Sequence, residues 1–284
     1  SEMCIRDRPH RPPQAAAVCA VLCERRVPML FDTHAHYDDE AFDPDRREVL
    51  AGLPQKGVGL VVDPGCTLTS SEKAVALAAE FPHVYAAVGL HPENCHDFQP
   101  EQIERLRQLA QREKVVAIGE VGLDYYWEEN PPRALQQEVL RRQLALAEEL
   151  KLPVIFHDRE AHGDSLAIVR EFPAVRGVFH CFSGSVEMAE ELLKLGWMLS
   201  FNGAITFKNA RKAPEVIAAV PLERMMVETD APYLTPVPFR GKRNDSGYVH
   251  LVAEKIAQLK GLPAEQVERQ TWENGVRFFG IPQE

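Results

Sequence analysis

The stretch Leu30-Phe31-Asp32-Thr33-His34-Ala35-His36 places two histidines directly after a short apolar run. A short apolar run of this kind is consistent with a strand buried in a parallel sheet. Residues two apart in a strand point to the same side, so His34 and His36 can bind one ion together. The stretch therefore predicts a strand with a pair of metal-capable histidines at its end.

Further apolar runs follow along the chain, and longer amphipathic stretches separate them. This alternation is typical of parallel βα units. The expected strands are Leu30–His34, Gly59–Asp63, Val84–Gly89, Val115–Gly119, Val154–His157, Gly177–His180, Met198–Phe201 and Met225–Thr229. About eight units close a (β/α)8 barrel of roughly 250 residues, which fits the length that remains after Met29.

A doubly wound open sheet is the alternative architecture. Such sheets usually have fewer strands and a glycine-rich phosphate loop after the first one. Here histidines follow the first strand instead, and we predict a single-domain TIM-type barrel over residues 29–284. Among its helices, Thr69-Ser70-Ser71-Glu72 has the form of a capping box, which predicts a helix start there.

Residues 1–28 differ in composition from the rest of the chain, with five arginines and a short apolar run from Ala15 to Leu22. A secretory signal would have this order, but Glu24, Arg25 and Arg26 follow where small residues should allow cleavage. The opening SEMCIRDR also resembles translated adaptor sequence. We expect residues 1–28 to be a non-native or disordered extension, with Met29 as the natural start.

The totals exclude some classes of protein. The chain has 284 residues, with 42 Asp and Glu against 32 Lys and Arg, so a broad basic surface for nucleic acid is not expected. None of the six cysteines forms a C-x-x-C pair, which indicates reduced thiols in a cytoplasmic protein. No apolar run approaches the ~18–20 residues that span a bilayer, and we expect no membrane association and no obligate protein partner.

Metal-capable side chains fall at the ends of the predicted strands. In a barrel these ends form one face, on which active sites are built. Taken singly, each histidine is more often structural than a ligand, Glu120 could neighbour a helix N-cap, and Asp230 could form a turn. Together they predict a metal site, and the residues are His34, His36, Glu120, His157, His180 and Asp230.

The motifs at these positions resemble the TatD family of metal-dependent deoxyribonucleases, within the amidohydrolase-like barrels. The first matching segments are Phe31-Asp32-Thr33-His34-Ala35-His36, Gly89-Leu90-His91-Pro92, Gly119-Glu120-Val121-Gly122-Leu123-Asp124-Tyr125 and Phe156-His157-Asp158-Arg159. The later ones are His180-Cys181-Phe182-Ser183-Gly184, Glu228-Thr229-Asp230-Ala231-Pro232-Tyr233-Leu234, Arg240-Gly241-Lys242-Arg243-Asn244 and Glu273-Asn274. Asp245-Ser246-Gly247 and Gly275-Val276 depart from the family pattern, and neither includes an expected ligand.

The resemblance implies two divalent cations, with Mg²⁺, Mn²⁺ or Zn²⁺ as candidates. His34, His36 and Asp230 would hold one cation, His157 and His180 the other, and Glu120 would bridge them. The mixed imidazole and carboxylate donors favour Zn²⁺, Mn²⁺ or Fe²⁺ over a site of oxygen ligands alone. Asp230 is the candidate general base or water-orienting group, with a role as a pure ligand as the alternative.

The resemblance and the position of the residues also suggest groups around the metals. Asp32 would support a ligand imidazole, or else be a buried strand-end residue that forms hydrogen bonds. Tyr125, Tyr126 and Trp127 could stack on a base, although packing is expected for at least one of them. Cys181 is interpreted as a small packing residue. The candidate substrate contacts are His91, Arg159, Arg240, Lys242 and Arg243.

The sequence therefore predicts a hydrolase that cleaves phosphodiester bonds of DNA, or of RNA, as a 3′-to-5′ exonuclease through a water activated by two metals. One alternative is hydrolysis of an ester or amide, such as a D-aminoacyl-tRNA. Barrels with that chemistry often carry a carboxylated lysine on strand four, where this chain has Glu120 and no lysine until Lys151. The other alternative is a non-catalytic metal-binding scaffold, against which the complete ligand set argues.

Overall fold

The computed structural model describes residues 29–282, so the predicted extension over residues 1–28 lies outside the described residues. Within the described range, eight strands form one sheet in the order β1 to β8, and each strand pairs in parallel with the next. The strands are β1 Leu30–Asp32, β2 Val58–Pro64, β3 Val84–Val88, β4 Val115–Asp124, β5 Val154–Arg159, β6 Gly177–Phe179, β7 Met198–Phe201 and β8 Met225–Val227. All eight lie where the sequence predicts them.

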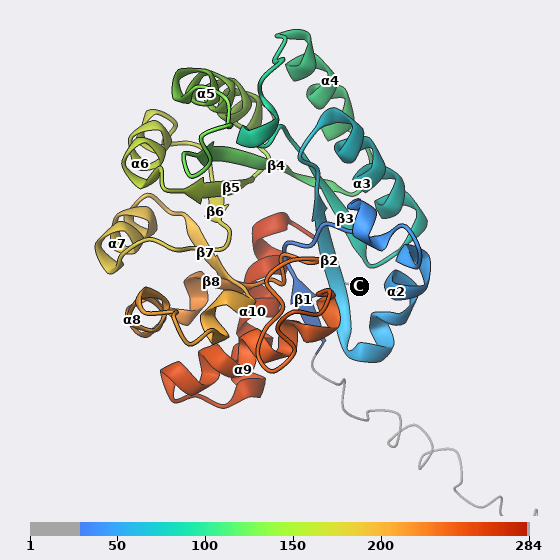
Figure 1. Cartoon of the computed structure of the whole chain (residues 1–284), viewed down its shortest axis with the longest axis vertical. Coiled ribbons are helices and arrows are strands. Elements are labelled where there is room, and N and C mark those ends of the chain that lie inside the picture. The colour runs from blue at the N-terminus through green and yellow to red at the C-terminus, as the bar shows by residue number, and fades with distance from the viewer. Residues whose placement is uncertain (1–28, 283–284) are drawn as a thin grey trace, which may run out of the picture.

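Helices follow the strands and surround them on the outside (Figure 1). They are α2 Arg46–Gly52, α3 Leu68–Glu80, α4 Glu101–Ala110, α5 Arg133–Leu150, α6 His162–Glu171, α7 Val186–Lys194, α8 Lys212–Ala219, α9 Val249–Lys260 and α10 Ala264–Phe279. The predicted capping box is displaced by two residues, because Thr67 is the N-cap of α3 and shares reciprocal hydrogen bonds with Ser70. No helix in this range is long and apolar enough to cross a bilayer.

The segments after β1 and β8 complete the ring. The Thr33 amide donates to the Val227 carbonyl at 3.1 Å, and the Asp230 amide donates to the His34 carbonyl at 2.9 Å. Ala35 and Ala231 then form an isolated parallel bridge. These bonds confirm the predicted single-domain (β/α)8 barrel, and they hold the two ends of the sheet together directly beside His34 and Asp230.

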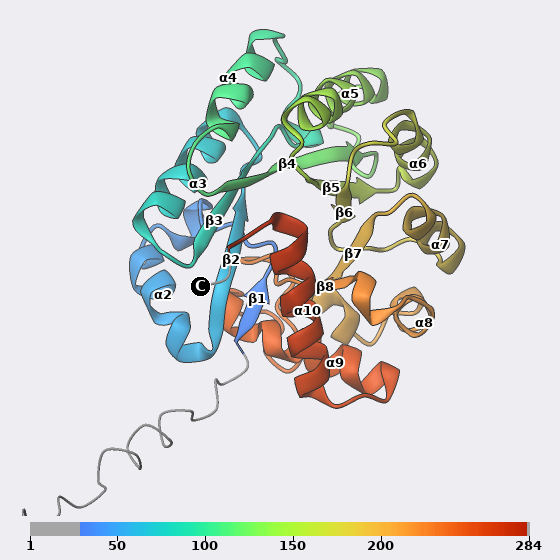
Figure 2. The same ribbon diagram turned by 180° about the vertical axis from the view of Figure 1, so that it is seen from behind.

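Helix α10 covers the end of the barrel opposite the carboxyl ends of the strands. Figure 2, which views the molecule from behind, shows α10 in front of the strands. Its Phe278 and Phe279 pack with inward-facing strand residues such as Val62, Ile155 and Met226 in one buried apolar cluster. The barrel interior is therefore filled at this end, as in other barrels of this type.

Two neighbouring residues, Asn274 and Gly275, hold α10 against the barrel. The Asn274 amide donates to the carbonyls of Leu222 and Met225, each at 2.8 Å. Gly275 allows close approach, because a Cβ there would lie 2.6 Å from Cδ1 of Phe31. The Gly275-Val276 departure from the family pattern thus fits a packing contact with β1.

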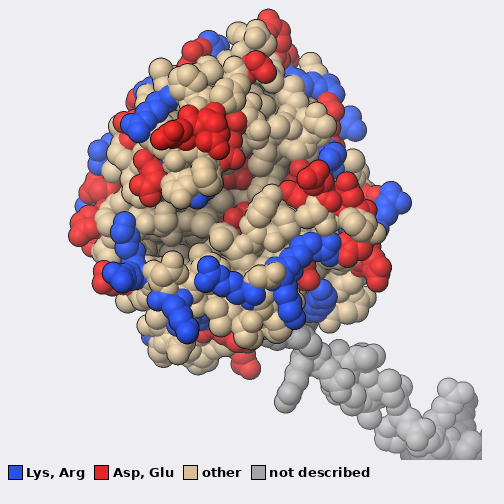
Figure 3. Space-filling model, viewed as in Figure 1, with Lys and Arg blue, Asp and Glu red and all other residues tan. Residues whose placement is uncertain are grey.

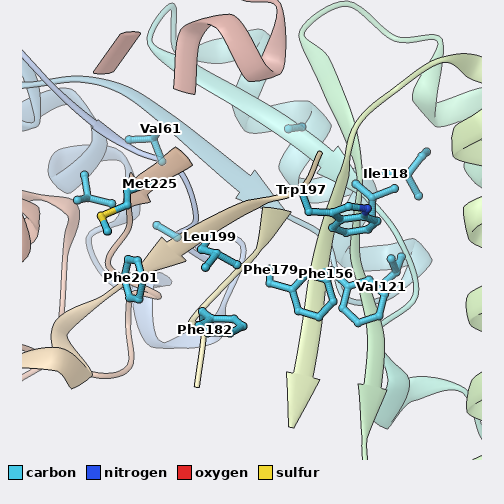
Figure 4. Packing of buried hydrophobic residues seen from close by; sticks show 14 of the residues in the cluster. Val61, Ile118, Val121, Phe156, Phe179, Phe182, Trp197, Leu199, Phe201 and Met225 are labelled. Atoms are coloured by element: carbon cyan, nitrogen blue, oxygen red, sulfur yellow. The ribbon is translucent and has the colours of Figure 1, made fainter. Parts of the chain in front are cut away.

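A second cluster packs between the strands and the outer helices, and Trp197 is its largest fully buried side chain. The Trp197 ring lies edge-on to Phe156 and Phe179, with centroids 5.7 and 5.2 Å away (Figure 4). Gly177 on β6 leaves room for it, because a Cβ at that position would overlap the indole. This packing fixes β5 and β6, whose ends carry His157 and His180.

Candidate metal centre

The structure brings the six predicted ligands together at the carboxyl ends of the strands. His180 follows β6 directly, and His34, His36 and Asp230 lie in the segments after β1 and β8. His157 lies within β5, and β4 continues to Asp124, so Glu120 lies within a strand and not after it as expected. They surround a cavity of about 820 Å³, lined among others by His36, Glu120, His157, His180 and Asp230. Figure 3 shows a hollow near the centre of this face.

The first group of donor atoms comes from the ends of β1 and β8. The Nε2 atoms of His34 and His36 lie 3.0 Å apart. Each of them is 3.6 Å from Oδ1 of Asp230. Glu120 Oε2 completes the group, at 3.2 Å from His34 Nε2 and 3.4 Å from His36 Nε2.

The second group comes from the ends of β5 and β6. His157 Nδ1 and His180 Nε2 lie 3.2 Å apart. Glu120 Oε1 is 2.9 Å from the former and 2.8 Å from the latter. Glu120 thus divides its two oxygens between the two groups, which is the position predicted for a bridging ligand.

His91 lies closer to these donors than a substrate contact needs to be. Its Nε2 is 3.4 Å from Glu120 Oε1, and its ring meets that of His157 edge-on. His91, Glu120 and His157 together form a set of atoms that could hold a metal ion. Its position therefore also allows His91 to be a further ligand of the second group.

The donor atoms fit divalent cations. A tetrahedral cation with ligands at 2.0–2.2 Å holds neighbouring ligand atoms roughly 3.3–3.6 Å apart. The separations within each group lie near that range, from 2.8 to 3.6 Å. The side chains are also largely buried, with Glu120 only 3% exposed. Buried carboxylates are normally paired with a positive charge or bound to a metal ion.

The electrostatics show how strongly the imidazoles influence Glu120. Burial alone raises the pKa of this carboxyl, but the charges of His180 and His91 outweigh it and hold the pKa well below the usual range. Burial also raises the pKa of Asp230, to about 6, although His180 and His36 oppose the shift. Glu120 is therefore held as a carboxylate, the form that binds cations.

Further polar groups orient the imidazoles of the two donor groups, and sequence reasoning missed their role. Asp124 Oδ2 accepts a hydrogen bond from His157 Nε2 at 3.0 Å, and the Pro64 carbonyl accepts one from His36 Nδ1 at 3.1 Å. Glu228 Oε1 lies 3.4 Å from His180 Nδ1. Strand spacing offers a signal for Asp124, because it is four residues after Glu120 on β4 and faces the same side.

We expected Asp32 to form a hydrogen bond with an imidazole, but it bonds to other groups. Its carboxylate accepts hydrogen bonds from the backbone amides of His34 and Thr229, at 3.3 and 2.9 Å, and from the Thr229 hydroxyl at 2.5 Å. The alternative interpretation, a buried strand-end residue, is therefore confirmed. Asp32 joins β1 to β8 at the level of the ligands.

We expect Asp124→Asn to weaken metal affinity or activity about 10- to 100-fold, the usual effect of removing a carboxylate that orients a ligand imidazole. Burial lowers the pKa of His157, yet the hydrogen bonds to Asp124 and Glu120 reverse this and raise it to about 9. Titration of the metal-free protein with Mn²⁺ or Zn²⁺ measures the change. The matched control is Asp97→Asn at an exposed site, and equal affinities for the two variants would contradict the assigned role.

The five predicted substrate contacts divide into two sets. His91 and Arg159 line the cavity, and the Arg159 guanidinium lies over the Tyr126 ring, 3.9 Å from its centroid. The structure places the basic loop before α9 outside the lining residues. There Arg243 forms a 2.7 Å ion pair with Asp45, while Arg240 and Lys242 lie over the rings of Phe207 and Phe239.

The neighbouring aromatic and thiol groups differ in exposure. Tyr125 is partly buried and donates a 2.9 Å hydrogen bond to Asp164, so packing explains it. Tyr126 and Trp127 are exposed at the rim, and Trp127 lines the cavity. Burial raises the pKa of the Cys181 thiol to about 12, which agrees with a packing residue and not a nucleophile.

Known proteins are similar in sequence to this chain along nearly the whole described range. The family model described as TatD related DNase matches residues 31–280. The metal-dependent hydrolase YabD of Bacillus subtilis, itself uncharacterized, is 45% identical over 255 residues, which are 89% of this chain and 100% of YabD. The uncharacterized metal-dependent hydrolase YcfH of Escherichia coli is 41% identical over 89% of this chain and 96% of YcfH.

Solved structures agree with these relatives. The crystal structure of YjjV, a TatD homologue from Escherichia coli, superposes with a TM-score of 0.84. It is 33% identical in sequence, and the match covers 89% of this chain and 98% of YjjV. The chain therefore belongs to the TatD family of metal-dependent hydrolases.

Proposed function

We propose that this hydrolase cleaves phosphodiester bonds of DNA, with RNA as the alternative substrate, as a 3′-to-5′ exonuclease. The observation that carries the proposal is the placement of Glu120 between two groups of donor atoms. His34, His36 and Asp230 would hold one cation, and His157 and His180 the other, with Mg²⁺, Mn²⁺ or Zn²⁺ as candidates. Two such cations activate a water and stabilise the charges that develop during displacement at phosphorus.

The residues of the chain have distinct tasks in this reaction. The Asp230 side chain is 15% exposed against 3% for Glu120, so it can meet a water in the cavity and take its proton. Arg159 lies in the same cavity and supplies a fixed positive charge for the phosphate. The Arg159 guanidinium is held by the Tyr126 ring beneath it, which limits the entropy lost on binding.

Two features favour this function over the alternatives. The β4 position that a carboxylated lysine occupies in many barrels acting on amides or esters is taken by Glu120. Lys and Arg also gather along the lower half of the cavity face, whereas Asp and Glu gather above the hollow (Figure 3). This separation of positive from negative charge suits an extended anion that lies along the positive side of the site. A non-catalytic scaffold would have no need to retain all the donors.

The test uses the full chain and a single-stranded DNA oligonucleotide labelled at either end, with Mg²⁺, Mn²⁺, Zn²⁺ or EDTA. We expect stepwise shortening that requires a divalent cation, with a 5′ label retained on the shortened strands. Release of the 5′ label as a mononucleotide would show that cleavage runs from 5′ to 3′ instead. Protein that binds cations but cleaves neither DNA nor RNA would move the assignment to ester or amide hydrolysis.

A further inference from the structure

A second cavity opens beside the metal centre. It has a volume of about 390 Å³ and lies between the segments that follow β6 and β7. The two cavities share Cys181, Ser183 and Ala204 in their walls. We call the second one the side pocket, and these shared residues place it directly beside the metal cavity.

The walls of the side pocket are largely apolar and aromatic. Phe182 and Ile205 are buried, whereas Phe207 is partly exposed. The Arg240 guanidinium lies over the Phe207 ring, 4.3 Å from its centroid. A predicted substrate contact thus packs on a wall residue of the side pocket, although Arg240 does not itself line either cavity.

The rim of the side pocket is positive. Arg211 and Lys212 line it and are exposed, and Arg211 is the N-cap of α8. The first turn of a helix carries unpaired amides and a partial positive charge, but here Pro214 lacks an amide hydrogen and Glu215 adds a negative charge, so the positive rim rests on the two side chains. Figure 3 shows Lys and Arg gathered in the region where Figure 1 places α8.

We propose that the side pocket binds one nucleotide of a single-stranded nucleic acid next to the scissile bond. The base would lie against Phe207 and the apolar wall, and a flanking phosphate would lie at Arg211 and Lys212. This rests on the proposed function, and it assigns a place to the base that flanks the scissile bond. A paired base stays within the duplex stack and cannot enter a separate pocket.

Three properties together select this occupant. Apolar walls alone would accept many groups, but the Phe207 ring favours a flat group and the cationic rim favours an anionic one. Small-molecule sites occupy roughly 300–1,000 Å³, so a pocket of 390 Å³ suits a single nucleoside and not a longer segment. The shared wall places that nucleoside beside the bond at the metals.

The experiment pairs a change in the protein with a change in the substrate. Single-stranded oligonucleotides carry either normal bases or a tetrahydrofuran abasic residue at the 3′-terminal or the next position. Phosphorothioate terminal linkages slow hydrolysis, so the Kd is read by fluorescence anisotropy with the Mg²⁺-loaded full chain. Phe207→Ala is compared with Phe98→Ala, since Phe98 is another partly exposed phenylalanine beneath an arginine, away from both cavities.

We expect removal of the base at one of the two positions to weaken binding to the wild-type protein about 10- to 100-fold, the usual effect of losing base–aromatic stacking. Phe207→Ala should weaken binding of the normal strand similarly and make that base irrelevant, whereas Phe98→Ala should retain the preference. If neither abasic strand binds more weakly than the normal one, or if Phe207→Ala keeps the base preference, the proposal is overturned.

The charge of the rim gives a second readout. In Arg211→Ala/Lys212→Ala the slope of log Kd against log salt should fall by about 0.7 for each phosphate that the protein no longer neutralises. Lys194→Ala/Arg269→Ala removes the same charge from exposed sites elsewhere, and its slope should match that of the wild type. Equal slopes for all three proteins would contradict a phosphate at Arg211 and Lys212.

The binding assay separates this inference from the proposed function. If the wild-type protein cleaves DNA but binds normal and abasic strands with equal Kd, the side pocket has been misassigned and the proposed nuclease activity is retained. If the base and Phe207 depend on each other for binding but no cation supports cleavage, the pocket stands and the chemistry is wrong.

Discussion

Replacing Glu120 with glutamine is expected to lower kcat/KM by about 1,000-fold, because each tenfold loss in rate corresponds to about 1.4 kcal/mol and metal ions supply several kcal/mol of charge stabilisation. Glu120 is the only residue in the described range that contributes an atom to both donor groups, through Oε1 and Oε2. A glutamine fills the same space but has one neutral oxygen and a nitrogen that cannot bind a cation.

Two measurements define this result: the steady-state rate on a labelled oligonucleotide and the metal content by elemental analysis. We expect both to fall in Glu120→Gln. The matched control is Glu128→Gln, at an exposed position in the loop after β4, which should change neither. Full activity with normal metal content in Glu120→Gln would refute the bridging role.

Trp197→Ala is expected to lower the free energy of unfolding by about 3–5 kcal/mol, the range for truncation of a buried large aromatic residue. The indole is 1% exposed and packs edge-on against Phe156 and Phe179. Its removal leaves a cavity between β5 and β6 that rigid neighbouring strands can fill only in part. The loss is a large share of the 5–15 kcal/mol that typically stabilises a domain.

Urea denaturation of the metal-free full chain measures this change without a contribution from bound cations. Trp127→Ala is the control, because that indole is 45% exposed and its loss should change stability by less than about 0.5 kcal/mol. A loss below about 1 kcal/mol in Trp197→Ala would mean that the neighbouring side chains collapse into the space.

The strands were predictable because each is a short apolar run with polar ends, and burial on both faces leaves that signature in the sequence. The ends of the strands were harder to predict. The structure extends β4 five residues past Gly119. The sequence predicted an end at Gly119 because the charged residues Glu120 and Asp124 interrupt the apolar run, although both lie within the strand. The start of α3 at Leu68 was missed because Thr67 and Thr69 offer similar capping patterns.

The candidate site was predictable where position along a strand decides position in space. His157 and His180 follow apolar runs directly and His34 follows one after two residues, so a parallel barrel brings them together. Contacts between elements were not predictable from one sequence. The bond from His157 to Asp124, the ion pair of Arg243 with Asp45 and the place of Arg240 over Phe207 depend on how separate loops pack.

The packing of α10 against the barrel has a consequence for the traffic of substrate and product. Because Phe278 and Phe279 fill the far end, a strand cannot be threaded through the molecule from one side to the other. Whatever enters the cavity must leave through the same opening, and under the proposed function a released nucleotide would share that exit with the shortened strand. Under that function a strand would have to be drawn in and withdrawn at the same opening.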